Sequence, residues 1–473
     1  MKTQEPFVDG IIAEPLHREP LDNELLDIDA RVNGNSVTAK PIAPAVDDGD
    51  SYTAATGLTP ATIAAQFQRV RANSIALCEP LELEDYGLQA MASTSPPKWH
   101  LAHTTWFFET FVLVPYIHNY QRWHPAFEHL FNSYYNGIGT PFSRPQRGLL
   151  SRPSVSEVME YRRAIDERIL TLLESSQTLG RNILETIELG LHHEQQHQEL
   201  LLTDLKYSFH VNPLQPAYRA SRRPAEVTQA EPEDPWVAFE GGVVEVGAEG
   251  QGFCFDNETP RHRQYLEPFC LAWRPVSNSD VLAFMADGGY QRPELWLADG
   301  WDLVQRERLT APLYWQRSDN GWRHFTLAGQ VPLVANQTAC HLSYYEADAY
   351  ARWAWARLPT EAEWEHAAKS QVVAGNFIDT GQCHPDVAVS SSPLAQLFGD
   401  VWEWTSSSYS PYPGYAPAAG AIGEYNGKFM CNQMVLRGGS CVSDRAHIRA
   451  TYRNFFYPAD RWQFSGLRLA RSR

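Results

Sequence analysis

A proline-rich stretch at residues 211–235 divides this chain of 473 residues into two parts of different character. In residues 58–210, apolar side chains recur at the spacing of α-helices. Residues 236–473 are instead rich in Gly, Trp and Tyr and contain short strand-like runs. Because a chain of this length is too long for one hydrophobic core, we expect a multidomain α plus α+β protein, with a helical domain, a linker and an α+β domain over these three ranges.

The first 57 residues, 1–57, are acidic, contain prolines and have almost no aromatic side chains. Such a composition predicts a partly disordered or draped arm. The whole chain has a formal net charge of −17. This charge argues against a nucleic-acid partner, since binding to phosphates requires clustered Lys and Arg.

Nothing in the sequence predicts export or a membrane span. The first residues lack the basic end and apolar run of a signal peptide. The most apolar stretch, 106–117, is too short to cross a bilayer and contains Glu109. Seven dispersed cysteines without a CxxC pair predict reduced thiols. We therefore expect a cytoplasmic protein with no membrane partner, and the sequence does not indicate its oligomeric state.

Four segments of the first part carry helix signals, and they run over residues 60–78, 98–115, 157–175 and 181–208. Thr59 is an N-cap for the first, and Ser154 with Glu157 forms a capping box before the third. Four such helices predict a four-helix bundle, in which metal sites are built from inward-facing side chains. In the second part we expect only two convincing helices, with capping boxes at Ser343 and Thr360.

Residues 193–197 read His-Glu-Gln-Gln-His, within the fourth predicted helix. Histidines four residues apart lie on one face of a helix, so the pair can bind one metal ion if a third ligand comes from a neighbouring helix. The pattern also matches the zinc-peptidase motif, in which Glu194 would be the general base. His100 and His103, in the second predicted helix, are the candidate third ligands.

These residues alone leave three possibilities: a zinc peptidase, a different metal enzyme, and a metal-binding module without turnover. The peptidase is the weaker interpretation, because the Gly and third His of the longer peptidase pattern do not follow His197. Three histidines would leave coordination positions open, as a catalytic metal requires. Imidazole ligands suit iron as well as zinc.

Three stretches of the helical part are SPPKWHLAHTTWFFE, FNSYYNGIGTPFSRPQRGLLSRP and HHEQQHQELLLTD. They resemble the DinB-like bundle of the sulfoxide synthases of ergothioneine biosynthesis, which are non-haem iron(II) enzymes that join a thiol to hercynine (Nα-trimethylhistidine) with dioxygen. The second part contains DNETPRH, RLPTEAEWEHAA, GDVWEWT, VLRGGS and FSGLRLAR. These stretches resemble the formylglycine-generating, sulfatase-modifying fold, which is C-type-lectin-like. The order and joint presence of the motifs over residues 58–473 make the resemblance specific.

The resemblance implies a set of site residues. It places the Fe(II) ligands on His103, His193 and His197, so that His100 would be a bystander and Glu194 structural. The resemblance also implies substrate-binding and catalytic side chains. It assigns a proton or electron donor to Tyr134 or Tyr135, the thiol carboxylate to Arg144 and Arg147, and hercynine contacts to Gln196, Tyr425 and Asn454, with Phe455 and Phe456 in the loop that closes over the metal.

The same loop indicates which thiol is used. Members of the family that use γ-glutamylcysteine carry an acidic and a basic residue where this chain has Phe456 and Asp460. We therefore expect free cysteine as the substrate, together with hercynine and dioxygen, and hercynylcysteine sulfoxide as the product. The same reaction with γ-glutamylcysteine is the alternative. Formylglycine formation is rejected, because Ser443 and Ile448 stand where that activity needs two cysteines, although Cys441 follows the RGGS stretch.

Overall fold

Long helices build the first part of the chain, as the sequence predicts. The structure is a computed structural model that describes residues 58–175, 179–220, 232–250, 252–389 and 393–473. All of these belong to one compact unit, Ser51–Arg473, whereas the predicted arm at 1–57 and part of the predicted linker, 221–231, lie outside the described residues. The helices of the first part are α2 (Pro60–Cys78), α3 (Pro97–Phe108), α4 (Val114–Tyr116), α5 (Phe127–Phe131), α6 (Val155–Ser175) and α7 (Arg181–Val211).

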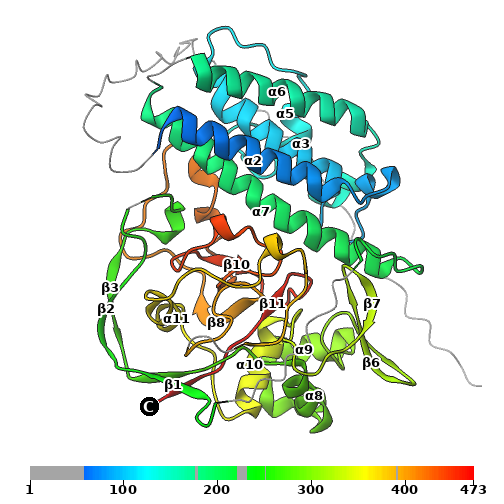
Figure 1. Ribbon diagram of the computed structural model, residues 1–473, viewed down its shortest axis with the longest axis vertical. Coiled ribbons are helices and arrows are strands. Elements are labelled where there is room, and N and C mark those ends of the chain that lie inside the picture. The colour runs from blue at the N-terminus through cyan, green and yellow to red at the C-terminus, as the bar shows by residue number, and fades with distance from the viewer. Residues whose placement is uncertain (1–57, 176–178, 221–231, 251, 390–392) are drawn as a thin grey trace, which may run out of the picture. The chain divides into compact units, whose positions relative to one another are not determined.

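The four long helices α2, α3, α6 and α7 pack side by side around a shared apolar core (Figure 1). Their predicted starts are confirmed where a cap was recognised. The Thr59 hydroxyl accepts a hydrogen bond from the Thr62 amide at the start of α2, and the Ser154 hydroxyl accepts one from the Glu157 amide before α6. These caps satisfy amide groups that a helix terminus leaves without an intrahelical partner.

The predicted helix at 98–115 is not one regular α-helix. The α-helical part ends at Phe108, and the chain continues as a wider π-helical turn, Glu109–Leu113. Pro115 gives a physical reason, because its ring would clash with the carbonyl four residues earlier in a regular α-helix. The turn also buries the Glu109 carboxylate, which accepts hydrogen bonds from the hydroxyls of Tyr120 and Tyr161.

The second part is an α+β domain of short strands, and the predicted fold class is confirmed. Its strands are β1 (Trp236–Phe239), β2 (Gly242–Val246), β3 (His262–Leu266), β4 (Phe269–Ala272), β5 (Trp315–Ser318), β6 (Gly321–Thr326), β7 (Gly329–Pro332), β8 (Trp402–Ser408), β9 (Met434–Arg437), β10 (Asn454–Phe456), β11 (Ser465–Gly466) and β12 (Ala470–Ser472). They form small sheets with the orders β1-β4-β12, β10-β9-β8-β11, β2-β3 and β5-β6-β7.

The prediction of only two helices in this domain is wrong. The capped helices α10 (Tyr344–Trp353) and α11 (Glu361–Ala368) are present, but α8 (Asn278–Ala286) and α9 (Ala298–Glu307) accompany them. Ser277 and Asp280 form a capping box before α8, so the sequence did carry a start signal for it. By contrast, α9 begins without a side-chain cap and could not be recognised in this way.

Helix α7 faces the second domain and lies next to the sheet that contains β8 and β10 (Figure 1). Several polar contacts from α7 contribute to this packing, including the two that follow. The Trp402 indole of β8 donates a hydrogen bond of 2.7 Å to the Glu199 carboxylate. The Lys206 Nζ lies 2.6 Å from the His341 Nε2. The helix that carries both histidines of the 193–197 motif therefore reaches the second domain directly.

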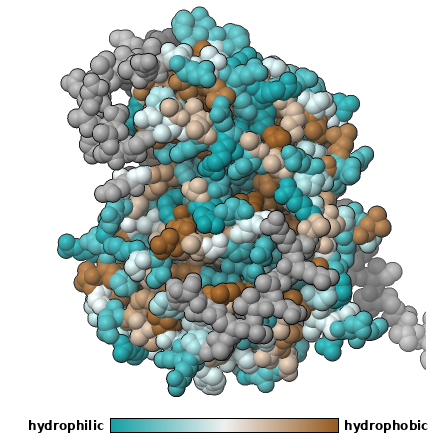
Figure 2. Space-filling view, in the orientation of Figure 1, coloured by the Kyte–Doolittle hydropathy of each residue, from teal (hydrophilic) through white to brown (hydrophobic). Residues whose placement is uncertain are grey.

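The face of the molecule shown in Figure 2 has hydrophobic residues scattered among hydrophilic ones. Among the described residues, no helix has the length and apolar character needed to cross a bilayer.

Candidate metal centre and its cavity

Helices α3 and α7 bring three histidines together. His103 comes from α3, and His193 and His197 come from successive turns of α7. Each offers one ring nitrogen, and these three atoms lie within 4.8 Å of one another. Because a spacing of four residues places two side chains on the same helix face, the packing of α3 against α7 is sufficient to add the third.

The orientation of His103 is set by a second hydrogen bond. Its Nδ1 lies 2.6 Å from the carbonyl oxygen of Phe131. A carbonyl only accepts hydrogen bonds, so this nitrogen carries the proton and Nε2 keeps its lone pair. The free Nε2 lies 3.1 Å from the Nε2 of His193. Two nitrogens that could bind a metal ion are therefore close together.

All three imidazoles are neutral at ordinary pH. Burial lowers the pKa of His193 to about 3. Burial, followed by the neighbouring His193, lowers the pKa values of His103 and His197 well below their usual range. A metal ion needs deprotonated nitrogen ligands, so a buried set of neutral imidazoles fits the iron that the sequence predicts. Three protein ligands also leave coordination positions open.

Glu194 is not placed as a peptidase base. Its carboxylate is 1% exposed and accepts hydrogen bonds from Arg71 (2.8 Å), Ser74 (2.5 Å) and Arg162. Burial by itself would raise the pKa of Glu194, but the two guanidinium groups outweigh it and lower the pKa to about 2. The carboxylate therefore joins α7 to α2 and α6, and Glu194 is absent from the wall of the cavity described next.

A cavity of about 380 Å³ lies beside the histidines, and both domains line it. From the bundle its wall includes Ser95, Trp99, His100, Tyr134, Arg144, Arg147, His193, Gln196, His197, Glu199 and Asp204. From the second domain it includes Trp402, Tyr425, Phe429, Tyr452, Asn454, Phe455, Phe456, Asp460 and Trp462. The structure therefore brings nearly every site residue predicted from the sequence to one cavity. Two of them, His103 and Tyr135, lie behind the wall.

The two adjacent tyrosines occupy different positions. Tyr134 lines the cavity, whereas Tyr135 is fully buried against Trp106 and Phe111, at ring distances of 5.7 and 5.0 Å. Their rings stack at 4.6 Å. Burial raises the pKa values of both hydroxyls, so each holds its proton at neutral pH. Only the Tyr134 side chain faces the space where a ligand would bind.

Arg147 is a buried cation beside the metal centre. Its side chain is 2% exposed, stacks 3.4 Å above the Trp99 ring and donates a hydrogen bond of 2.8 Å to Ser95 Oγ. Burial and, to a lesser extent, the nearby charge of Arg144 lower the pKa of Arg147 to about 8. Neither arginine forms an ion pair within the part of the chain that the structure describes. The two guanidinium groups are thus available to an anionic ligand.

Gln196 is held by tyrosines from the second domain. Its Nε2 donates a hydrogen bond of 2.7 Å to the Tyr452 hydroxyl, and its Oε1 accepts one from the Tyr425 hydroxyl. The Tyr425 ring lies 5.6 Å from the His193 ring. Tyr425 therefore lies next to the three histidines, and the two tyrosine hydroxyls fix the orientation of the Gln196 amide.

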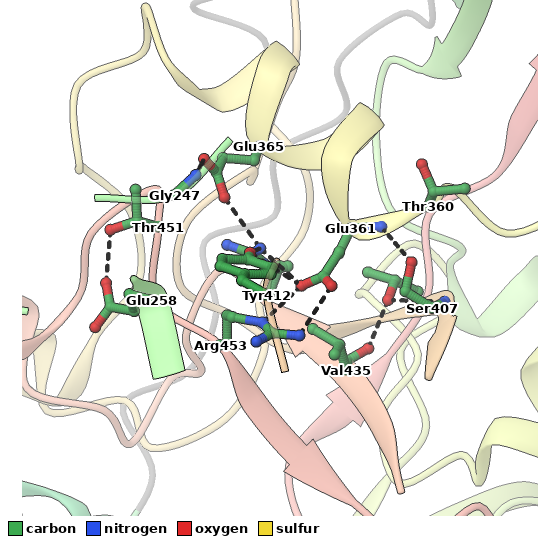
Figure 3. A network of polar contacts seen from close by, with 12 residues as sticks. Gly247, Glu258, Thr360, Glu361, Glu365, Ser407, Tyr412, Val435, Thr451 and Arg453 are labelled. Carbon is green, nitrogen blue, oxygen red and sulfur yellow. Dashed lines mark hydrogen bonds and ion pairs between the residues drawn. The ribbon is translucent and has the colours of Figure 1, made fainter. Parts of the chain in front are cut away.

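A buried ion pair positions the loop at 452–458. Figure 3 shows the Arg453 guanidinium pointing at Glu361 of α11, with Nε and Oε2 2.9 Å apart. Because β10 also pairs with β9, with Asn454 opposite Leu436, the loop has support from two elements. Asn454 and the two following phenylalanines are thereby held at the cavity wall.

Several residues of the site were not predicted from the sequence. Tyr452, Trp402, Phe429 and Trp462 line the cavity without having been assigned a role. Tyr452 precedes Asn454 by two residues in the loop that the resemblance places over the metal, so its position in the sequence could have indicated it. The other three come from separate segments, and only the packing of the domain identifies them.

His100 lies outside the group of three candidate ligands, as expected, but it contacts one of them. Its Nδ1 lies 2.8 Å from the Nδ1 of His197, and its Nε2 lies 3.1 Å from the Asp204 carboxylate. The spacing gives the reason, since His100 and His103 are three residues apart and share one face of α3. Asp204 follows His197 by seven residues, which is two turns along the same face of α7.

The site expected for formylglycine formation is absent from the described residues. The Ser443 hydroxyl donates a hydrogen bond of 2.6 Å to the Glu199 carboxylate, and Ile448 packs in the core. Cys441 is buried and burial raises its pKa. Ser443 therefore attaches the second domain to α7, and the three positions offer no pair of reactive thiols.

Comparisons with known proteins match both parts of the chain. Residues 66–201 match the DinB superfamily, and residues 221–391 and 384–473 match the sulfatase-modifying factor enzyme 1-like domain. A hercynine oxygenase of Mycobacterium tuberculosis is 31% identical over 448 residues, which cover 87% of this chain and 99% of that protein. A hercynine oxygenase of Mycolicibacterium smegmatis is 34% identical over 253 residues, 48% of this chain and 58% of that protein. Ergothioneine biosynthesis protein 1 of Schizosaccharomyces pombe is 25% identical over 232 residues, 46% of this chain and 28% of that protein.

Proposed function

Because this chain belongs to the hercynine oxygenase family, we propose that it joins hercynine to free cysteine, with iron(II) as its metal, in ergothioneine biosynthesis. In this reaction the imidazole ring loses a C–H bond and the thiol loses its S–H bond. A C–S bond and an S=O bond form, and the second oxygen atom of dioxygen leaves as water. We also propose a cytoplasmic location, which rests on the dispersed cysteines of the sequence.

One observation carries the proposal: three neutral imidazoles cluster beside a cavity, two of them in its wall, and the other walls hold two cations without an ion pair among the described residues. His103, His193 and His197 would hold the iron. Bound there, iron(II) would supply the activation of dioxygen. The protein's own contribution is to bring the two organic substrates together at this point, which replaces an improbable encounter in solution.

Arg144 and Arg147 would bind the carboxylate of cysteine. Guanidinium groups bind carboxylates in bidentate fashion, and Arg147 is already fixed by Trp99 and Ser95. Burial raises the pKa of Asp460, at the same cavity, to about 6, so most of it is ionised at neutral pH. Its carboxylate can therefore pair with the ammonium group of the same amino acid.

Hercynine would occupy the side of the cavity formed by Gln196, Tyr425 and Asn454. The amide of Gln196 is held by two tyrosine hydroxyls, so it can contact the bound substrate without a cost in reorientation. Aromatic faces attract quaternary ammonium groups, and Tyr425 with Phe455 supplies such faces near this end. Tyr134, whose hydroxyl is protonated at neutral pH, would donate the proton that the departing water needs.

Anaerobic spectroscopy on the iron(II)-loaded protein tests the proposal most directly. Addition of hercynine and cysteine should change the spectrum of the metal, and admission of oxygen should then give the sulfoxide, identified by its mass. A protein that binds zinc stoichiometrically and shows no spectral change in its iron form would contradict the proposal. Peptidase activity that is lost in Glu194→Gln would favour the zinc-peptidase alternative.

A further inference from the structure

His100 connects the metal centre to a carboxylate that lies outside it. On one side its Nδ1 is 2.8 Å from the Nδ1 of His197, and on the other its Nε2 is 3.1 Å from Asp204 Oδ2. The same carboxylate oxygen accepts a hydrogen bond of 2.8 Å from the Ser95 amide. His100 and Asp204 are each 3% exposed, so water competes little with this chain of contacts.

The positions of the protons in this series of hydrogen bonds follow from the Asp204 carboxylate at one end of it. An ionised carboxylate can only accept hydrogen bonds, so the Nε2 of His100 carries a proton. In a neutral imidazole the other nitrogen is then an acceptor, and His197 must donate from its Nδ1. The lone pair of His197 is consequently on Nε2, where a metal ion can bind it.

We propose that His100 and Asp204 are positioning residues for the metal, which hold His197 in the tautomer and ring orientation that offers Nε2. This inference rests on the proposed function of the three-histidine site. His103 receives the equivalent support from the Phe131 carbonyl. The Nδ1 of His193 has no hydrogen-bond partner among the described residues, so two of the three ligands are oriented by a second contact.

The size of the effect can be estimated from other metal sites. Loss of an outer hydrogen-bond partner of a ligating histidine typically weakens metal binding by about 10- to 100-fold. A change at His100 should therefore alter metal affinity without removing a ligand. Loss of His197 itself should be more severe, because it leaves two ligands.

Anaerobic titration with cobalt(II), followed by its d–d absorption, measures the affinity without turnover. The variant His100→Phe keeps an aromatic ring but has no nitrogen, and we expect its dissociation constant for cobalt(II) to rise by about 10- to 100-fold. The variant His100→Asn places an oxygen acceptor near the position of Nδ1 and should recover most of the affinity. Asp204→Asn should weaken binding less than His100→Phe. Glu109→Gln is the matched control, because this buried carboxylate contacts no histidine of the site.

The outcomes separate the two proposals. If the unaltered protein binds no cobalt(II), the three-histidine metal site of the proposed function is wrong. If it binds cobalt(II) and His100→Phe binds equally tightly, the positioning role is overturned. Equal losses in His100→Phe and His100→Asn would assign the effect to packing and also overturn it. Should the His100 variants fail to fold, an unchanged dissociation constant in Asp204→Asn overturns the inference.

Discussion

Tyr134 and Tyr135 are identical and adjacent in the sequence, but they lie in different surroundings. Tyr134 lines the cavity and Tyr135 packs behind it against Trp106. The chemistry that a hydroxyl can perform depends on its access to the substrate, because proton transfer requires hydrogen-bond reach. The structure therefore favours Tyr134 as the proton donor.

We predict that Tyr134→Phe lowers the rate of sulfoxide formation by about 10²- to 10⁴-fold, which is the range for loss of a general acid. Substrate and iron binding should be nearly unchanged, and oxidation of the thiol to its sulfinate should become the main reaction. Product ratios measured by mass spectrometry check this, with Tyr135→Phe as the matched control. An unchanged rate and product ratio in both variants and in the double variant would reduce the two residues to packing.

The choice of thiol should depend on individual charged residues at the cavity wall. γ-Glutamylcysteine adds a carboxylate and moves the ammonium group to a remote end, and neither Phe456 nor Asp460 complements this arrangement. Leaving such groups unpaired costs about 1–3 kcal/mol each. We therefore expect kcat/KM for cysteine to exceed that for γ-glutamylcysteine by at least about tenfold.

A competition assay with both thiols measures this preference. The double substitution Phe456→Asp and Asp460→Arg should shift it towards γ-glutamylcysteine, because it introduces the acidic and basic pair at those positions. A preference of the unaltered protein for the dipeptide would show that the charge argument is incorrect.

Among the helices, α7 carries two of the three candidate metal ligands, and its Glu199 carboxylate is one of its attachments to the second domain. Glu199 accepts hydrogen bonds from Trp402 Nε1 (2.7 Å), Ser440 Oγ (2.7 Å) and Ser443 Oγ (2.6 Å). All three donors belong to the second domain. The RGGS segment that resembles formylglycine-generating enzymes thus serves here as a support for the metal-bearing helix.

We predict that Glu199→Ala lowers the free energy of unfolding by about 3 kcal/mol, because buried donors left unpaired cost about 1–3 kcal/mol each and some regain water. Glu199→Gln keeps the shape and an acceptor oxygen and should cost less than about 1 kcal/mol. Urea unfolding followed by tryptophan fluorescence checks both values. Equal stabilities of the two variants would mean that the carboxylate does not anchor the helix.

At the scale of the whole molecule, Lys206 extends from α7 into the core of the second domain. It is fully buried, its Nζ lies 4.6 Å from the Tyr314 ring and 4.7 Å from the Phe464 ring, and it contacts His341. Burial lowers the pKa of Lys206 from 10.5 to about 8. A charged ammonium in this position therefore costs stability at neutral pH, although its contacts join the two domains.

The pH dependence of stability should report this cost. Between pH 8 and 10.5 the unfolded chain keeps the proton that the folded protein has released, so the folded state gains stability as the pH rises. We expect the unaltered protein to gain about 3 kcal/mol relative to Lys206→Met across this window, at 1.36 kcal/mol for each pH unit. Unfolding of the metal-free proteins in urea at pH 7.5 and pH 10.5 measures the difference. A difference that does not change with pH would contradict the lowered pKa.

The two-part division of the chain and the helical bundle could be predicted from the sequence, because both are local properties. Proline content, capping residues and helical spacing act over a few residues, and a spacing of four places His193 and His197 on one face in any α-helix. The remaining site residues were predicted from resemblance to a family. Such a resemblance indicates which residues meet in the folded protein, but it does not give the physical reason why they meet.

Only the tertiary structure decided which of these residues meet and how they are held. His100 contacts His197, and Glu199 contacts Ser443, because segments far apart in the sequence pack together. Tyr135 is buried behind Tyr134 by the packing of the surrounding elements. Local spacing sets the face on which a side chain lies. Its partner across that face is determined by the close packing of other elements, and no short-range signal encodes that packing.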